Sequence, residues 1–97
     1  MIDLGSIVGF DWNDGNLHKN LLKHGVKPKE AEQVFNDEFV LFLKDVIHSE
    51  QEERFHALGQ TSEGRHLFVT FTLRSEETLI RIVSARDMDR RERGCYD

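Results

Sequence analysis

Histidine and arginine are the side chains in this 97-residue sequence whose types and positions suggest chemistry. Seven of the eight arginines lie at or after Arg65, with Arg54 as the exception, whereas all five lysines lie at or before Lys44. Arginine binds phosphate and carboxylate groups in planar, bidentate geometry, and histidine exchanges protons near neutral pH. Together they suit metal-free cleavage of RNA, in which one group accepts the proton of the ribose 2′-hydroxyl and a cation stabilises the charge that develops on the phosphate. The alternative is a charged surface that only faces solvent.

Motifs for other common chemistries are absent from the sequence. It contains no G-x-x-x-x-G-K-[ST], G-x-G-x-x-G, H-E-x-x-H or G-x-S-x-G pattern. His18 and His24 are six residues apart, which does not place them on one helix face, so we expect no histidine-pair metal site there. Cys95 is the only cysteine, which excludes an internal disulfide and a cysteine-rich zinc site. We therefore expect no cofactor and no metal, and we interpret Cys95 as an incidental thiol.

Hydrophobic periodicity predicts the elements that must position the histidines and arginines. A short first strand at 7–12 precedes a helix that Asn13 or Asp14 can cap and Gly25 can end, and a second helix that starts at Pro28 and ends at 36–37. Four further strands are predicted at 39–43, 53–60, 66–73 and 78–85, with short turns at 62–64 and 75–77. A short helix follows from residue 87 and breaks at Gly94. This order predicts an α+β fold, with two N-terminal helices packed on a four- to five-stranded antiparallel sheet and a short C-terminal helix.

Strand alternation divides this predicted sheet into a core face and an open face. The alternate apolar residues from Leu67 to Leu73 form the face that we expect to pack on the helices. In the last strand, Ile80 and Ile82 make a core pair, which puts Arg81 on the other face. A one-residue error in register would move any strand's set to the wrong side. The residues that we expect to gather on the open face are Arg54, His56, His66, Thr70 and Arg81.

Length and composition predict one cytoplasmic domain that spans residues 1–97. The chain is 38% hydrophobic and 32% charged, and no apolar run approaches the roughly 18 residues of a membrane-spanning helix. The first ten residues contain an acid and no lysine or arginine, so they do not resemble a secretory signal. A net charge of −5 argues against a protein that coats nucleic acid without specificity.

Four sequence blocks follow one another along the chain: KHGV at 23–26, E-A-x-x-V-F-x-D at 30–37, HSEQEERFHALG at 48–59, and IRIVSAR at 80–86 with R-R-E-R-x-x-Y at 90–96. In order and spacing they resemble the BrnT family of ribonuclease toxins from bacterial type II toxin–antitoxin systems, over about residues 10–96. The resemblance implies a RelE-like fold and an endoribonuclease that cleaves RNA without a metal and halts translation. It also implies a BrnA-like antitoxin with a ribbon-helix-helix DNA-binding end, a toxin–antitoxin heterotetramer that represses its own operon, and contact with operator DNA only through the antitoxin.

The arginines in these blocks have both functional and structural interpretations. We expect Arg81 to be a phosphate clamp, and its alternative is a cross-strand ion pair with an acid such as Glu53. Arg54 is a second candidate clamp. Arg86 ends the last strand, where it either contacts RNA or contacts the C-terminal helix.

The remaining candidates are histidines and aromatic residues. His56 is a candidate proton acceptor because of its strand parity. His24 is either an active-site histidine or a residue at a helix C-terminus, where the helix dipole favours imidazolium. Tyr96 lies either near the reaction centre, as the resemblance implies, or packs the last helix on the sheet. Phe68, on the open face, could stack a base or contact an antitoxin segment. The catalytic candidates are thus Arg81, Arg54, His56, Tyr96 and His24, and the RNA-binding candidates are Arg86, Arg74, Phe68 and His48.

A second function, from a different class, also fits the sequence. The open face could hold an acidic or amphipathic segment of a partner protein without catalysing any reaction. The net charge of −5 and the lack of a fixed catalytic constellation motivate this alternative. Direct binding of DNA is a third possibility, but the arginine-rich terminus is short for a helix that reads the major groove.

Overall fold

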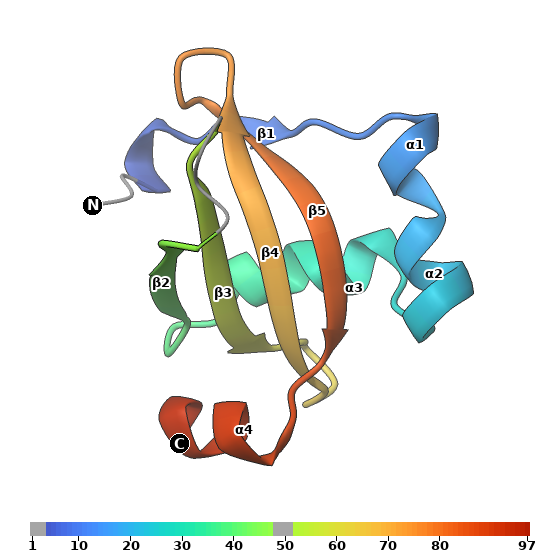
Figure 1. Cartoon of the computed structure of the whole chain (residues 1–97), viewed down its shortest axis with the longest axis vertical. Helices are drawn as coiled ribbons and strands as arrows, with labels where there is room; N and C mark the ends of the chain where they lie inside the picture. Colours follow the sequence, from blue (N-terminus) through green and yellow to red (C-terminus); the bar gives the residue numbers. More distant parts are fainter. Residues whose placement is uncertain (1–3, 48–51) are drawn as a thin grey trace.

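The computed structural model describes residues 4–47 and 52–97. Its strands form a sheet in the order β1-β5-β4-β3-β2. Helix α3 passes behind this sheet, α1 and α2 lie at its side, and α4 lies at its lower end (Figure 1). The elements are η1 (Leu4–Ser6), β1 (Gly9–Phe10), α1 (Asp14–Leu17), α2 (Lys19–His24), α3 (Pro28–Gln33), η2 (Val34–Asn36), β2 (Leu41–Asp45), β3 (Arg54–Gln60), β4 (His66–Arg74), β5 (Leu79–Asp87) and α4 (Arg90–Tyr96).

The sheet is mixed rather than antiparallel. β1 runs parallel to β5, with Gly9 opposite Leu79 and Phe10 opposite Ile80. The other neighbouring strands pair antiparallel, as expected for strands joined by short turns. The prediction of an antiparallel sheet is therefore wrong for β1. No tight turn joins β1 to β5, so turn geometry, on which the prediction relied, does not set the direction of this pair.

The N-terminal helices are not confirmed in the predicted arrangement. The first one is split at His18 into α1 and α2, which contact β5, and among the residues whose burial is described α3 contributes Ala31 to the core. Local signals nevertheless act as predicted. Asn13 caps α1, because its Oδ1 accepts a hydrogen bond from the Asn16 backbone at 3.1 Å. Gly25 follows α2 with φ +66°, a left-handed conformation that glycine adopts at little cost.

The C-terminal helix is confirmed, but it does not break at Gly94. α4 extends from Arg90 to Tyr96 and contains this glycine. Asp89 caps it by accepting a hydrogen bond from the Glu92 backbone at 2.8 Å, and the Glu92 carboxylate accepts one from the Asp89 backbone at 2.9 Å. This capping box sets where the helix begins and outweighs the weak helix propensity of one glycine.

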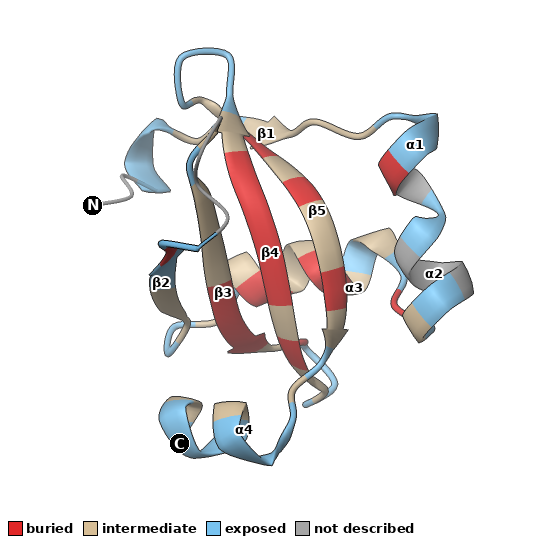
Figure 2. Cartoon of the chain, viewed as in Figure 1, coloured by how far each residue is buried: buried red, intermediate tan, exposed pale blue. Residues whose placement is uncertain are grey.

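The hydrophobic core lies between the sheet and α3. Val69 and Phe71 of β4 are fully buried there with Val34 of η2, which confirms the predicted core parity of β4 (Figure 2). The Phe35 and Phe71 rings meet edge to face, with their centroids 5.0 Å apart. Because α3 and η2 cover this face, the functional candidates of the opposite parity are directed to the other side.

The hairpin between β4 and β5 has an unusual backbone. Ser75, Glu76 and Glu77 adopt positive φ angles of 52°, 57° and 70° in succession. Left-handed backbone costs a residue with a side chain roughly 1–2 kcal/mol. In the hairpin between β3 and β4, the positive φ of +88° falls on Gly64, for which it is not strained.

Within the described residues, no helix combines the length and the apolar character needed to span a membrane.

Candidate active site

The open face of the sheet collects the predicted polar residues by strand register. His56 of β3 lies opposite Thr70 of β4, and Thr72 lies opposite Arg81 of β5. Arg54 lies opposite Asp45 of β2. The register thus confirms the predicted parity of Arg54, His56, Thr70 and Arg81, together with His66, which lies opposite Gln60. It establishes their common face but not their chemical roles.

A bulge in β5 places both of its arginines on this face. Thr70 pairs with Ser84, whereas the next residue, Phe71, pairs with Ile82, so one residue of β5 has no partner in the ladder. Arg81 and Arg86 are five residues apart, and strict alternation would point them to opposite faces. The bulge restores their common parity. Simple alternation could not have predicted this arrangement.

His56 has a polar side chain at each of its ring nitrogens, a hydrogen-bond partner at Nδ1 and an ion-pair partner at Nε2. Its Nδ1 lies 3.0 Å from Thr70 Oγ1, and its Nε2 lies 3.3 Å from Asp45 Oδ2. The other carboxylate oxygen of Asp45 accepts a hydrogen bond from the Ile47 backbone at 3.2 Å. Only 9% of the Asp45 side chain and 20% of the His56 side chain are exposed. Sequence analysis missed Asp45, since the predicted strand ended at residue 43. Asp45 is two residues after Leu43, so a strand extended to residue 45 would have placed both side chains on the same face.

Two arginines flank a buried hydroxyl next to this histidine. Thr72 lies between the neighbouring strands that carry Arg54 and Arg81, and it is fully buried. Among the described residues, its Oγ1 is the buried side-chain polar atom without a hydrogen-bond partner. Arg81 donates to Asp11 at 3.3 Å, so its ion pair is with Asp11 and not with Glu53, which pairs with Lys44.

Phe68 and Arg86 form a packed unit beside His56. The Phe68 and His56 ring centroids are 4.5 Å apart, and the Arg86 guanidinium carbon lies 4.4 Å from the Phe68 centroid. Arg86 also donates two hydrogen bonds of 2.8 Å to the carboxylate of Glu92 in α4. These bonds raise the pKa of Arg86 and hold the pKa of Glu92 below its ordinary value. The predicted contact between Arg86 and the C-terminal helix is therefore present, and Phe68 already contacts two protein groups.

Tyr96 anchors α4 at the opposite end of β3 from Arg54. Its hydroxyl donates to Asp37 Oδ2 at 2.5 Å, and its ring meets His66 edge to face. Burial, followed by this hydrogen bond, raises the pKa of Tyr96 to about 12. Burial alone would raise the pKa of Asp37, but hydrogen bonds from Tyr96 and from the Gln60 and Phe39 backbones lower it. Tyr96 therefore packs α4 against the sheet, and the length of β3, about 20 Å for six residues, separates it from Arg54.

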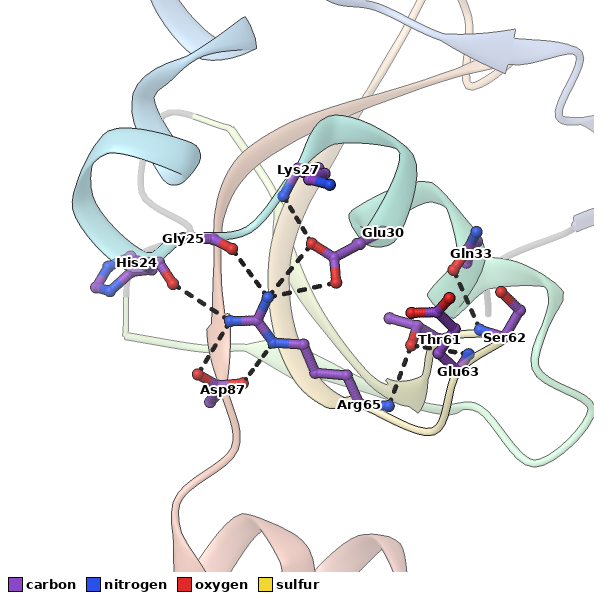
Figure 3. A network of polar contacts seen from close by, with 10 residues as sticks. All are labelled: His24, Gly25, Lys27, Glu30, Gln33, Thr61, Ser62, Glu63, Arg65 and Asp87. Carbon is purple, nitrogen blue, oxygen red and sulfur yellow. Dashed lines mark hydrogen bonds and ion pairs between the residues drawn. The ribbon is translucent and has the colours of Figure 1, made fainter.

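His24 lies at the far end of β5 from Arg81, beside a polar network centred on Arg65 (Figure 3). Arg65 donates to both carboxylate oxygens of Asp87, at 2.7 and 3.1 Å, and to the backbone carbonyls of His24 and Gly25, at 3.3 and 2.9 Å. It also donates to Glu30 at 3.3 Å. His24 therefore ends α2 within this network, as its structural interpretation predicted, and is not brought to Arg54, His56 and Arg81.

The remaining candidates are placed as follows. Arg74, at the end of β4, forms an exposed ion pair with Glu52 at 3.2 Å. His48 lies outside the described residues. No group of three or more His, Cys, Asp or Glu side chains positioned to hold a metal occurs in the part of the chain that the structure describes.

Comparison with known families identifies one match. The family model described as "Ribonuclease toxin, BrnT, of type II toxin-antitoxin system" matches residues 12–92. The matched region includes β2 to β5 and ends inside α4. Comparison with curated proteins gave no significant match.

Proposed function

This chain belongs to the BrnT family of ribonuclease toxins of type II toxin–antitoxin systems, and we propose that it cleaves RNA on the open face of its sheet. The observation that supports this location is the gathering of Arg54, His56 and Arg81 on one face by the register of three neighbouring strands. A histidine and two arginines match what the reaction needs: an exchangeable proton site and positive charge near the phosphate.

In the proposed reaction, the ribose 2′-hydroxyl attacks the adjacent phosphorus and passes its proton to the Thr70 hydroxyl, which in turn gives its own proton to His56 Nδ1. The bond from phosphorus to the 5′-oxygen breaks, and water supplies the proton that this oxygen needs. The products are a 2′,3′-cyclic phosphate and a free 5′-hydroxyl. Arg54 and Arg81 stabilise the negative charge that builds on the phosphate. The reaction requires no metal.

Cleavage by this chain in the cytoplasm halts translation. As a type II toxin it has a protein antitoxin, which we propose to be BrnA-like, with a ribbon-helix-helix end that binds the operator. The two proteins form a heterotetramer that represses their operon, and operator DNA is contacted through the antitoxin. Arg74, Arg86 and Phe68 border the site on the strands that carry it and extend the surface available to RNA.

Incubation of the purified protein with a defined RNA in excess EDTA tests this function. Removing one group that stabilises developing charge typically lowers the rate by about 10²–10³-fold. We expect this loss in Arg81→Ala, and no loss in Arg91→Ala, which removes an exposed arginine of α4. Thermal unfolding of both variants verifies that they are folded.

The outcomes separate the candidate functions. Cleavage by the wild type and by Arg91→Ala, but not by folded Arg81→Ala, supports the proposed site. Equal cleavage by all three proteins refutes the role of Arg81. Intact RNA in every reaction, together with no growth arrest on expression, favours the binding-module alternative.

A further inference from the structure

The side chains that contact the two ring nitrogens of His56 indicate which nitrogen carries its proton. In neutral imidazole one nitrogen donates and the other accepts. A carboxylate can only accept, so the nitrogen that faces Asp45, Nε2, must carry the hydrogen. Nδ1 then accepts from the Thr70 hydroxyl. A hydroxyl can also accept, so Thr70 keeps its hydrogen bond when Nδ1 becomes protonated.

We propose that Asp45 is a positioning residue that directs proton uptake by His56 to Nδ1 and stabilises the imidazolium that forms. This inference rests on the proposed function, because it assigns a second residue to the same proton transfer. The carboxylate is suited to this role because it is buried and fixed by the Ile47 backbone. In such an environment an ionic interaction is screened less than at the surface.

Other charged groups near the ring act with or against Asp45. Arg54, two residues away on β3 and opposite Asp45, opposes protonation of His56. From β5, Arg86 lies beyond the Phe68 ring of β4, and its charge is countered by Glu92 of α4. Arg81, also on β5, is countered by Asp11. Of these groups, Asp45 contacts the ring directly with a negative charge, so its removal has a predictable sign.

Nuclear magnetic resonance of the ¹⁵N-labelled protein tests the proposal without reference to catalysis. Long-range ¹H–¹⁵N spectra distinguish the two neutral tautomers, and we expect the Nε2–H form for His56. Asp45→Asn keeps the size of the side chain and a possible acceptor but removes the charge. We expect this variant to lower the pH midpoint of the His56 titration by about 1 unit or more, because the negative charge that favours the imidazolium is lost.

Two controls separate this effect from a general disturbance. Asp14→Asn removes an exposed carboxylate in α1 and leaves the His56 midpoint where it is. Thr70→Val, which removes the other partner of the ring, retains the Nε2–H tautomer because Asp45 still selects it.

The same variants are assayed for RNA cleavage over a range of pH. If Asp45 acts through His56, the acidic limb of the kcat/KM profile moves to lower pH in Asp45→Asn by the shift measured for His56. An Nδ1–H tautomer in the wild type, or a midpoint that moves no further in Asp45→Asn than in Asp14→Asn, overturns the proposal. If the spectra meet the expectation but the protein leaves RNA intact, or the cleavage profile does not move, the proposed role of His56 in catalysis fails while its coupling to Asp45 stands.

Discussion

Replacement of Arg65 by methionine removes a guanidinium that joins four parts of the fold. Arg65 directly precedes β4, and its guanidinium binds the end of β5 through Asp87, the end of α2 through backbone carbonyls, and α3 through Glu30 (Figure 3). Methionine retains the apolar part of the side chain, so the change mainly removes charge and hydrogen bonds. Arg65→Lys keeps the charge but cannot reproduce the two parallel bonds to Asp87.

The expected loss of stability follows from the exposure of the partners. A hydrogen bond to a charged group contributes about 1.5–3 kcal/mol when well buried, and an exposed ion pair about 0–1 kcal/mol. Asp87 is 62% exposed, whereas the Arg65 and Glu30 side chains are 28% and 25% exposed. We therefore expect Arg65→Met to lower the free energy of unfolding by about 2–3 kcal/mol, and Arg65→Lys by about half as much. For a domain of this size, each kcal/mol lowers Tm by about 4–8 °C.

Urea unfolding of the wild type, Arg65→Met and Arg65→Lys at pH 7 measures these differences, with the exposed Arg91→Met as the control. The pH dependence gives a second check. The hydrogen bond from Arg65 lowers the pKa of Asp87, so this contribution is present above the ordinary aspartate pKa of 3.8 and is lost as the pH falls through the lower folded-state value. The gap between wild type and Arg65→Met should thus narrow below about pH 4. A loss under about 0.5 kcal/mol, or a lysine variant as stable as the wild type, would refute the reasoning.

Two further predictions concern Tyr96 and the β4–β5 hairpin. Because Tyr96 is the only tyrosine, absorbance at 295 nm reports its titration alone, and we expect a midpoint near pH 12 in the folded protein and near 10 in denaturant. The interactions that raise this pKa stabilise the fold fully below pH 10, and their contribution is lost as the pH rises toward 12. A folded-state midpoint near 10 would contradict the hydrogen bond to Asp37. In the hairpin, Glu76→Gly should raise the free energy of unfolding by about 1 kcal/mol, because glycine adopts the observed φ of +57° without strain; an unchanged urea midpoint would count against that strain.

Most of the local structure could be predicted from the sequence because its signals lie within a few residues of each other. Asn13, Gly25 and Pro28 set the ends of helices through their own backbone preferences, and they do so as predicted. The direction of β1 could not be predicted in the same way, since its partner β5 is about 70 residues away and no short turn connects them. The β5 bulge was also missed, because several residues in this strand are β-branched and none of them signals which one has no partner on β4.

The candidate site could be predicted only where strand parity alone decides the outcome. Arg54 and His56 share a face because they are two residues apart on one strand, and the register adds Arg81 from another strand. To place Asp45 in the site, the exact end of β2 must be known, and element ends are the least certain part of a sequence-based prediction. Its contact with His56 depends on a pairing between strands that the sequence alone does not establish.

The blocks that carry the family resemblance perform two different physical tasks in this fold. KHGV supplies the His24 and Gly25 carbonyls, and the following block supplies Glu30, and all three bind the same guanidinium of Arg65. These residues connect helices to the sheet at the end that is remote from Arg54 and Arg81. The blocks that contain Arg54 and Arg81 instead contribute side chains to the open face. A motif match alone therefore cannot distinguish a histidine that faces the proposed site from one that ends a helix. For His24 and His56 the difference lies in their surroundings: His24 contributes its backbone carbonyl to the Arg65 network, whereas both ring nitrogens of His56 are bonded to side chains on the open face.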